Sequence, residues 1–138
     1  MLRERIVLDT NCLVMSLSSR NRYSEIWRRF VKGEYILCVS NDILEEYEEV
    51  IGRNISPKVA KIVLQYFQIL PNVQFVDPHY SFGLIQADED DNKFVDCAIA
   101  SNALFIVSED RHFKELANIP FPKVEVIGID AFMYFLDR

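Results

Sequence analysis

The sequence predicts an α/β fold with a mainly parallel sheet of about five strands. Two observations predict it. Short apolar segments rich in β-branched residues alternate along the chain with longer segments whose apolar residues recur at helical spacing. No repeat, low-complexity segment or linker divides the 138 residues, and this length suits one domain. We therefore expect a single domain over residues 1–138, with the element order β-α-β-α-α-β-α-β-α-β-α.

The first predicted strand covers residues 4–9, a short β-branched segment that ends in an acid. Residues 22–32 carry apolar side chains at helical spacing, and Gly33 fits the end of that helix. Residues 35–39, with the sequence YILCV, are expected to form a second buried strand.

A second helix is expected to begin at a cap provided by Ser40 or Asn41 and to end near Gly52. A third begins at Pro57, since proline is favoured at the first helical position, and Pro71 ends it. The remaining predicted elements are a strand over 73–76, a helix over about 91–102, a strand over 104–108, a short helix over 111–117, a strand over 124–127 and a helix over 130–137.

Composition narrows the class of protein. Half of the residues are hydrophobic and 26% are charged, which suits a folded domain. No apolar segment approaches the ~20 residues of a membrane span, and the N-terminus lacks the long apolar stretch of a signal peptide. The three cysteines form no CxxC motif. They are interpreted as reduced thiols, and we expect a cytoplasmic protein.

The charge balance is acidic. The 15 basic and 21 acidic residues give a net charge of −6, whereas nucleic-acid-binding proteins usually carry a basic surface. Acidic residues gathered around divalent cations would be neutralised in the working state, and two such ions would supply about +4.

Carboxylates stand where predicted strands end and where the following helices begin. Ligands of parallel α/β sheets bind beyond the carboxyl ends of the strands, so these acids should converge at one edge. Taken singly, each acid has a simpler explanation as a helix cap or a solvated surface residue. The exception is Asp96, which lies beside the apolar face inside a helix and needs a partner or a metal. The candidates are Asp9, Glu45, Glu46, Asp91, Asp96 and Asp110.

Such a cluster favours a hard divalent cation. Carboxylate oxygens suit Mg²⁺ or Mn²⁺, and cysteine or histidine ligands are absent from the pattern. One or two such ions lower the pKa of bound water and stabilise an in-line displacement at phosphorus. The predicted chemistry is phosphodiester hydrolysis.

Three segments together resemble the PIN-domain family. They are VLDTN at 7–11, SNDILEEYEEVI at 40–51 and DEDDNKFVDCAIASNALFIVSEDRHF at 88–113. More narrowly, they are similar to the bacterial PIN group described as toxin components of toxin–antitoxin pairs. The resemblance implies a three-layer α/β/α sandwich and an endoribonuclease that uses one or two Mg²⁺ or Mn²⁺ ions.

The resemblance also assigns roles to residues. It implies catalytic and metal-binding roles for Asp9, Glu46, Asp96 and Asp110, with Asp91 as an additional metal ligand. Glu45 is the alternative to Glu46. Glu109 departs from the family, which often has glycine there. The supporting polar residues are Thr10, Asn11, Asn92 and Ser108.

Basic residues near the first strand and after Asp110 are candidates for RNA contact, with a solvated helix face as the alternative. Tyr23 and Trp27 could stack on bases, but their helical spacing favours core packing. The RNA-contact candidates are Arg20, Arg22, Arg28, Arg29 and Arg111.

The leading hypothesis is a metal-dependent ribonuclease that acts as a toxin, with RNA as substrate, an antitoxin protein as partner and no membrane association. A homodimer through Phe132, Tyr134 and Phe135 is a further expectation, although these residues would also suit a core. The alternative function is a non-catalytic RNA- or protein-binding module on the same fold. A nucleotide-binding enzyme is disfavoured, because neither GxxxxGK[ST] nor GxGxxG is present.

Overall fold

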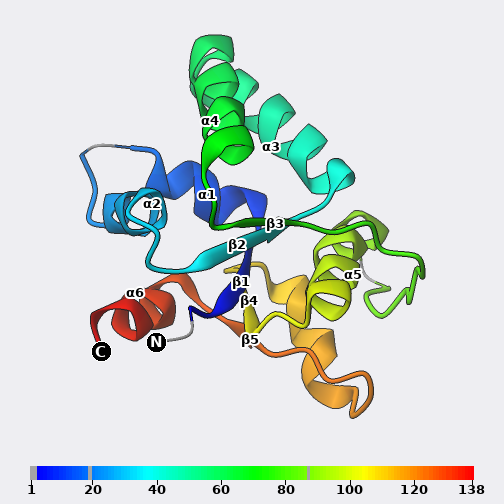
Figure 1. Ribbon diagram of the computed structural model, residues 1–138. Coiled ribbons are helices and arrows are strands. Elements are labelled where there is room, and N and C mark those ends of the chain that lie inside the picture. Colours follow the sequence, from blue (N-terminus) through cyan, green and yellow to red (C-terminus); the bar gives the residue numbers. More distant parts are fainter. Residues whose placement is uncertain (1–2, 19, 87) are drawn as a thin grey trace.

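The computed structural model describes residues 3–18, 20–86 and 88–138. Its centre is a five-stranded parallel sheet with the strand order β3-β2-β1-β4-β5 (Figure 1). The strands are β1 (Arg5–Leu8), β2 (Ile36–Val39), β3 (Val73–Phe75), β4 (Phe105–Val107) and β5 (Val126–Ile127). The helices are α1 (Thr10–Ser16), α2 (Ser24–Val31), α3 (Asn41–Asn54), α4 (Pro57–Ile69), α5 (Asn92–Ser101) and α6 (Ile129–Asp137), with 3₁₀ helices η1 (Glu89–Asp91) and η2 (Arg111–Asn118).

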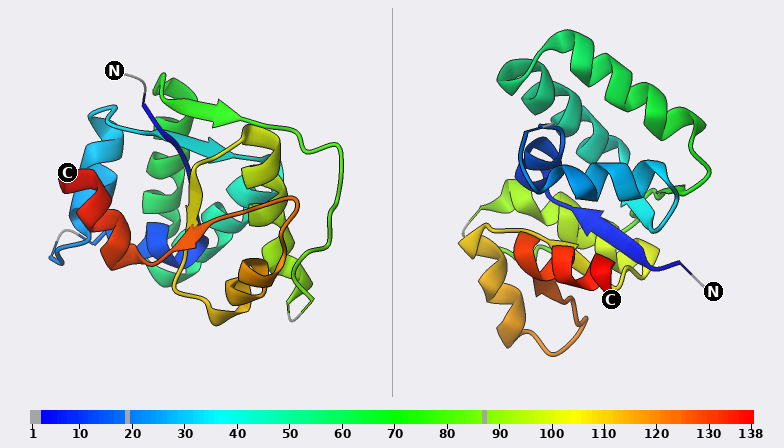
Figure 2. Two further views of the ribbon diagram at one scale, coloured as in Figure 1. Left: turned by 90° about the horizontal axis from the view of Figure 1, so that it is seen from below. Right: turned by 90° about the vertical axis from the view of Figure 1, so that its left-hand side faces the viewer.

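Helices cover both faces of the sheet, as the α/β sandwich predicted from the sequence requires. Helix α5 lies on one face, and α2 and α6 lie on the other (Figures 1 and 2). Helices α3 and α4 pack side by side as a hairpin. The predicted fold class is therefore confirmed.

The strand order places a topological switch between β1 and β4. From β1 the chain builds outward through β2 and β3, and it then returns to the other side of β1 to form β4 and β5. Val7 lies opposite Ile106, and Leu8 lies opposite Val107. Ligand sites in parallel sheets form at such a switch, beyond the carboxyl ends of the two strands. Asp9 follows one of these strands, and Ser108 follows the other.

One local prediction was wrong, and one helix differs in type. Helix α1 begins directly after β1, whereas the sequence indicated no helix before residue 22. The segment is short and rich in residues that suit a strand equally well, so periodicity could not reveal it. The segment after Asp110 is helical as predicted, but it is a 3₁₀ helix. Of the two caps considered for α3, Ser40 provides it, because its side chain accepts from the backbone N–H of Ile43. Helix α4 begins at Pro57 as predicted, and Ser56 caps it by accepting from the N–H of Val59.

Aromatic side chains fill the core between the sheet and helices α2, α4 and α6. Trp27 packs on Phe67 with ring centroids 6.2 Å apart, which places it in the core rather than on an RNA-binding surface. Phe132 is fully buried against Tyr35. Tyr134 is 85% exposed and lies on the surface. The homodimer expected from these C-terminal aromatic residues stays a prediction. Among the described residues, no helix is long and apolar enough to cross a membrane.

One buried amide ties the turn before β2 to the start of β3. Asn72 is 1% exposed, and its Nδ2 donates to the backbone oxygens of Phe30 and Tyr35, each at 2.8 Å. These bonds satisfy carbonyl groups that water cannot reach.

Replacing Asn72 by alanine should therefore lower the free energy of unfolding by about 2–3 kcal/mol, because two buried backbone oxygens each lose a hydrogen bond and the side chain leaves a space. Urea denaturation at neutral pH measures this loss. Asn54→Ala, at an exposed position in α3, is the control and should stay within about 0.5 kcal/mol of the wild type. Equal stability of the two variants would contradict the assignment.

Candidate active site

Asp9 lies at the centre of the switch between β1 and β4. It is 6% exposed and caps α1, where its Oδ1 accepts from the backbone N–H of Cys12 at 2.9 Å. Its Oδ2 accepts from the hydroxyl of Ser108. Burial raises the pKa of Asp9, and these hydrogen bonds offset part of that rise. The carboxylate is thus held in one orientation but is short of positive charge.

Asp110 lies next to Asp9, beyond the end of β4. It caps η2 by accepting from the backbone N–H of His112 at 2.9 Å, and its own N–H donates to Ser108 Oγ at 3.0 Å. The negative charge of Asp110 contributes to the raised pKa of Asp9. Ser108 therefore joins the two carboxylates across the switch, in the supporting role expected from the sequence.

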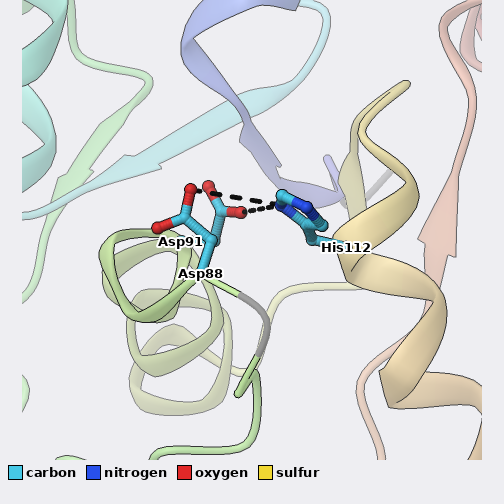
Figure 3. Close-up of side chains that lie close together, drawn as sticks. All are labelled: Asp88, Asp91 and His112. Carbon is cyan, nitrogen blue, oxygen red and sulfur yellow. Dashed lines mark ion pairs between the residues drawn. The ribbon is translucent and has the colours of Figure 1, made fainter.

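Asp91 joins this group from the start of α5 (Figure 3). Its Oδ2 lies 3.4 Å from His112 Nδ1, and Asp88 Oδ2 lies 4.0 Å from the same nitrogen. Burial is the main cause that raises the pKa of Asp91 to about 6, and the charges of Asp110 and Asp88 add to it. We call Asp9, Asp88, Asp91, Asp110 and His112 the strand-end cluster.

Glu46 belongs to a neighbouring hollow. Its Oε2 accepts from the hydroxyl of Thr10, and its Oε1 lies 2.7 Å from Lys93 Nζ. Lys93 also pairs with Asp90 at 3.0 Å. Burial alone would lower the pKa of Lys93, but the hydrogen bonds with the two carboxylates outweigh it and raise that pKa. Lys93 thus supplies positive charge to Glu46.

Asp96 faces the same hollow. It is 8% exposed, and its Oδ1 accepts from the backbone N–H of Phe82 at 3.1 Å. Burial raises its pKa, while this hydrogen bond lowers it. The hollow has a volume of about 470 Å³, and we call it the acidic groove. Its lining residues are Asp42, Glu45, Glu46, Glu49, Ser81, Glu89, Asp90, Asn92, Lys93 and Asp96.

The structure therefore divides the predicted acids between two adjacent places. Asp9 and Asp110 lie together with Asp91, the additional ligand expected from the sequence. Glu46 and Asp96 line the acidic groove. Thr10, which directly follows Asp9, bonds to Glu46 and connects the two places.

The comparisons with known proteins point to one family. A family model described as "PIN domain" matches residues 5–112. This chain belongs to the PIN-domain family. A search of curated proteins found no match.

Solved structures share the fold. A chain of VapBC2 from Rickettsia felis, solved bound to a DNA fragment from the promoter, aligns with a TM-score of 0.59 and 17% identity over 90% of this chain and 98% of that chain. The PIN domain endonuclease Utp24 aligns with a TM-score of 0.54 and 15% identity over 90% of this chain and 84% of that chain. At these identities the likeness shows a shared fold.

Three arginines on or just before α2 of this PIN domain, Arg22, Arg28 and Arg29, make ion pairs within the chain. Arg29 pairs with Asp137 and donates to the backbone oxygen of Leu136. Arg22 pairs with Asp130 on α6. These contacts hold α2 against α6. Of the candidates for RNA contact, Arg29 is partly buried and the other four, Arg20, Arg22, Arg28 and Arg111, are exposed. Arg28 pairs with Glu25 on its own helix.

The polar residues expected to support the site have different roles. Asn92 exchanges two hydrogen bonds with the backbone of Ile85, both at 2.9 Å, so it holds the 77–86 segment against α5. Asn11 is exposed at the first turn of α1. Glu109 is exposed and lies beside Gly128, where an added Cβ would come within 2.8 Å of its Oε2.

Sequence reasoning did not assign site roles to Lys93 and Asp88, and it did not identify His112 as a ligand. The spacing of His112 from Asp110 is the signal that could have found it, because an Asp cap binds the backbone two residues on and fixes that residue beside it. Lys93 follows the acidic start of α5, but only the packing of α5 on α3 shows that it reaches Glu46.

The strand-end cluster fits a divalent cation. Asp91 Oδ2 and His112 Nδ1 are buried and have no hydrogen-bond partner among the residues that the structure describes. Burial raises the pKa values of Asp9 and Asp91. Carboxylates that are desolvated, crowded and unpaired are stabilised by a bound cation. Asp9, Asp91 and Asp110 would hold it.

Asp91 should make stability depend on pH in the absence of metal. Its pKa of about 6 lies above the usual value of 3.8, so its contribution to stability is present below pH 4 and is lost as pH rises through about 6. Asp91→Asn removes this loss. Between pH 4.5 and 7.5 the free energy of unfolding of the variant should rise relative to wild type by about 1–2 kcal/mol.

Urea denaturation in EDTA at both pH values measures this difference. Glu48→Gln, at an exposed position on α3, is the control for loss of a carboxylate. A pH dependence that is the same in Asp91→Asn, Glu48→Gln and wild type would show that Asp91 is not destabilised by burial.

Proposed function

We propose that this PIN domain is a divalent-metal-dependent endoribonuclease that hydrolyses RNA phosphodiester bonds at the strand-end cluster and the acidic groove. The observation that carries the proposal is the set of crowded carboxylates at the β1–β4 switch, two of which have raised pKa values. The PIN-domain family match supports it. So does the shared fold with a protein described as a PIN domain endonuclease.

The roles follow from the contacts. A bound Mg²⁺ or Mn²⁺ would activate water and neutralise charge on the scissile phosphate. Asp9, Asp91 and Asp110 hold the ion, and Ser108 keeps two of these carboxylates in place through its hydroxyl. Glu46, oriented by Thr10 and Lys93, faces the acidic groove.

The ammonium group of Lys93 offers a second role. It is 16% exposed and lies among carboxylates of the acidic groove. A cation at this position offsets the repulsion between an acidic surface and phosphate groups.

We further propose that the nuclease is the toxin of a toxin–antitoxin pair. The support is the sequence resemblance to that bacterial group and the shared fold with a chain of the VapBC2 complex. Induced expression in a bacterium should arrest growth, and Asp9→Asn at equal abundance should not. Growth unaffected by an active nuclease would remove the toxin role and leave the nuclease.

Cleavage of a mixed pool of labelled RNAs tests the activity. Purified protein should cut RNA with Mn²⁺ or Mg²⁺ and not with EDTA. Asp9→Asn should reduce the rate about 100-fold or more, because a metal ligand is lost. Glu48→Gln is the control, because Glu48 is an exposed carboxylate on α3 that does not line the acidic groove. It should leave the rate unchanged.

The same assay, together with a measurement of metal binding, separates the roles of Asp91, which precedes α5, and Asp96, which lies within it. If the strand-end cluster holds the metal, Asp91→Asn loses activity together with metal binding, whereas Asp96→Asn retains metal binding. Metal binding without cleavage of any RNA, in a folded protein, would instead favour the non-catalytic binding module.

A further inference from the structure

The imidazole of His112 lies among three carboxylates. Its Nδ1 is 3.3 Å from Asp110 Oδ1, 3.4 Å from Asp91 Oδ2 and 4.0 Å from Asp88 Oδ2. Figure 3 shows Asp88 and Asp91 pointing from the start of α5 toward this ring, which projects from η2. One ligand atom from each of Asp88, Asp91 and His112 lies within 4.8 Å of the others.

The ion pairs of His112 with these carboxylates are too long to be charge-assisted hydrogen bonds. A charge-assisted N–H···O⁻ hydrogen bond has a length of about 2.7–2.9 Å, and both close carboxylates lie farther away than that. His112 Nδ1 and Asp91 Oδ2 are buried and make no hydrogen bond within the described part of the chain. Two ligands of one small ion at ~2.1 Å, set at right angles, would lie ~3 Å apart. The spacing is close to that of ligands that share an ion.

The backbone holds these groups in place without a metal. Asp110 accepts from the N–H of His112, which fixes the start of η2. Asp88 accepts from the N–H of Asp90 at 3.1 Å and fixes the start of η1. Phe113 is 2% exposed and packs on Phe94 of α5, so η2 is anchored to the helix that carries Asp91. The site is therefore built on three fixed points rather than on mobile side chains alone.

We propose that His112 Nδ1, with Asp88 and Asp91, ligates a divalent first-row transition-metal ion, and that this nitrogen ligand makes the site prefer such an ion to Mg²⁺. The inference rests on the proposed function, because it takes the strand-end cluster to be a metal site. It adds His112 and Asp88 as ligands and specifies the class of metal ion. Imidazole nitrogen binds first-row transition ions well, whereas Mg²⁺ takes oxygen ligands. An all-carboxylate site would show this preference more weakly.

Calorimetric titration of the metal-free full chain with Co²⁺, Mn²⁺ and Mg²⁺ tests the proposal without measuring activity. Wild type should bind Co²⁺ more tightly than Mn²⁺, and Mn²⁺ more tightly than Mg²⁺. His112→Ala should weaken Co²⁺ binding about tenfold or more and change Mg²⁺ binding far less. His112→Asn, which offers an oxygen ligand, should retain Mg²⁺ without restoring the preference for Co²⁺.

His79→Ala is the matched control, because His79 is the other histidine of the chain and is exposed. It should bind all three ions as wild type does. Circular dichroism in EDTA establishes that each variant is folded. Electron spin-echo modulation of bound Mn²⁺ should carry a ¹⁴N signal in wild type and in His79→Ala, and none in His112→Ala.

The outcomes separate this inference from the proposed function. Metal binding that is lost in Asp9→Asn but unchanged in His112→Ala would overturn the histidine ligand and leave the carboxylate site. Absence of a ¹⁴N signal from bound Mn²⁺ in wild type would do the same. A folded wild type that binds none of the three ions would overturn the inference and the metal-dependent nuclease together.

Discussion

The pairing of β1 with β4 is the constraint on which the site depends. The backbone N–H of Asp9 donates to the oxygen of Val107 at 3.0 Å, which continues the parallel ladder to the last residue before α1. This contact brings Asp9 beside Ser108 and Asp110, about 100 positions later in the chain. Because both strands end at the same edge, their following residues must share one small volume.

That shared volume creates an electrostatic cost. Asp9, Asp91 and Asp96 all have pKa values raised chiefly by burial, so the fold holds carboxylates where ionisation is unfavourable. The protein relieves this cost differently in two places. In the acidic groove Lys93 supplies an internal cation to Glu46. In the strand-end cluster, two buried ligand atoms have no hydrogen-bond partner within the described part of the chain, and a bound metal ion would complete it.

Helix caps and candidate ligands are the same residues. Asp9 caps α1 and Asp110 caps η2, each with one carboxylate oxygen. The simpler explanation of each acid as a cap is therefore correct for both, and it does not compete with metal binding, because a carboxylate has further lone pairs. Capping fixes the side-chain direction and leaves the acid with capacity for another partner.

The sequence by itself determined the alternation of elements, the parallel sheet and the placement of Asp9 and Asp110 at strand ends, since hydrophobic periodicity and strand direction are local properties of the chain. It also indicated the start of α5 as acidic. It missed α1, because one short helix directly after a strand leaves no periodic signal. Only the tertiary structure decided that Asp96 faces the acidic groove, that Lys93 reaches Glu46 and that His112 meets Asp91. Those contacts depend on the rotation of α5 about its axis and on the path of η2, which packing across the sheet sets and local sequence does not.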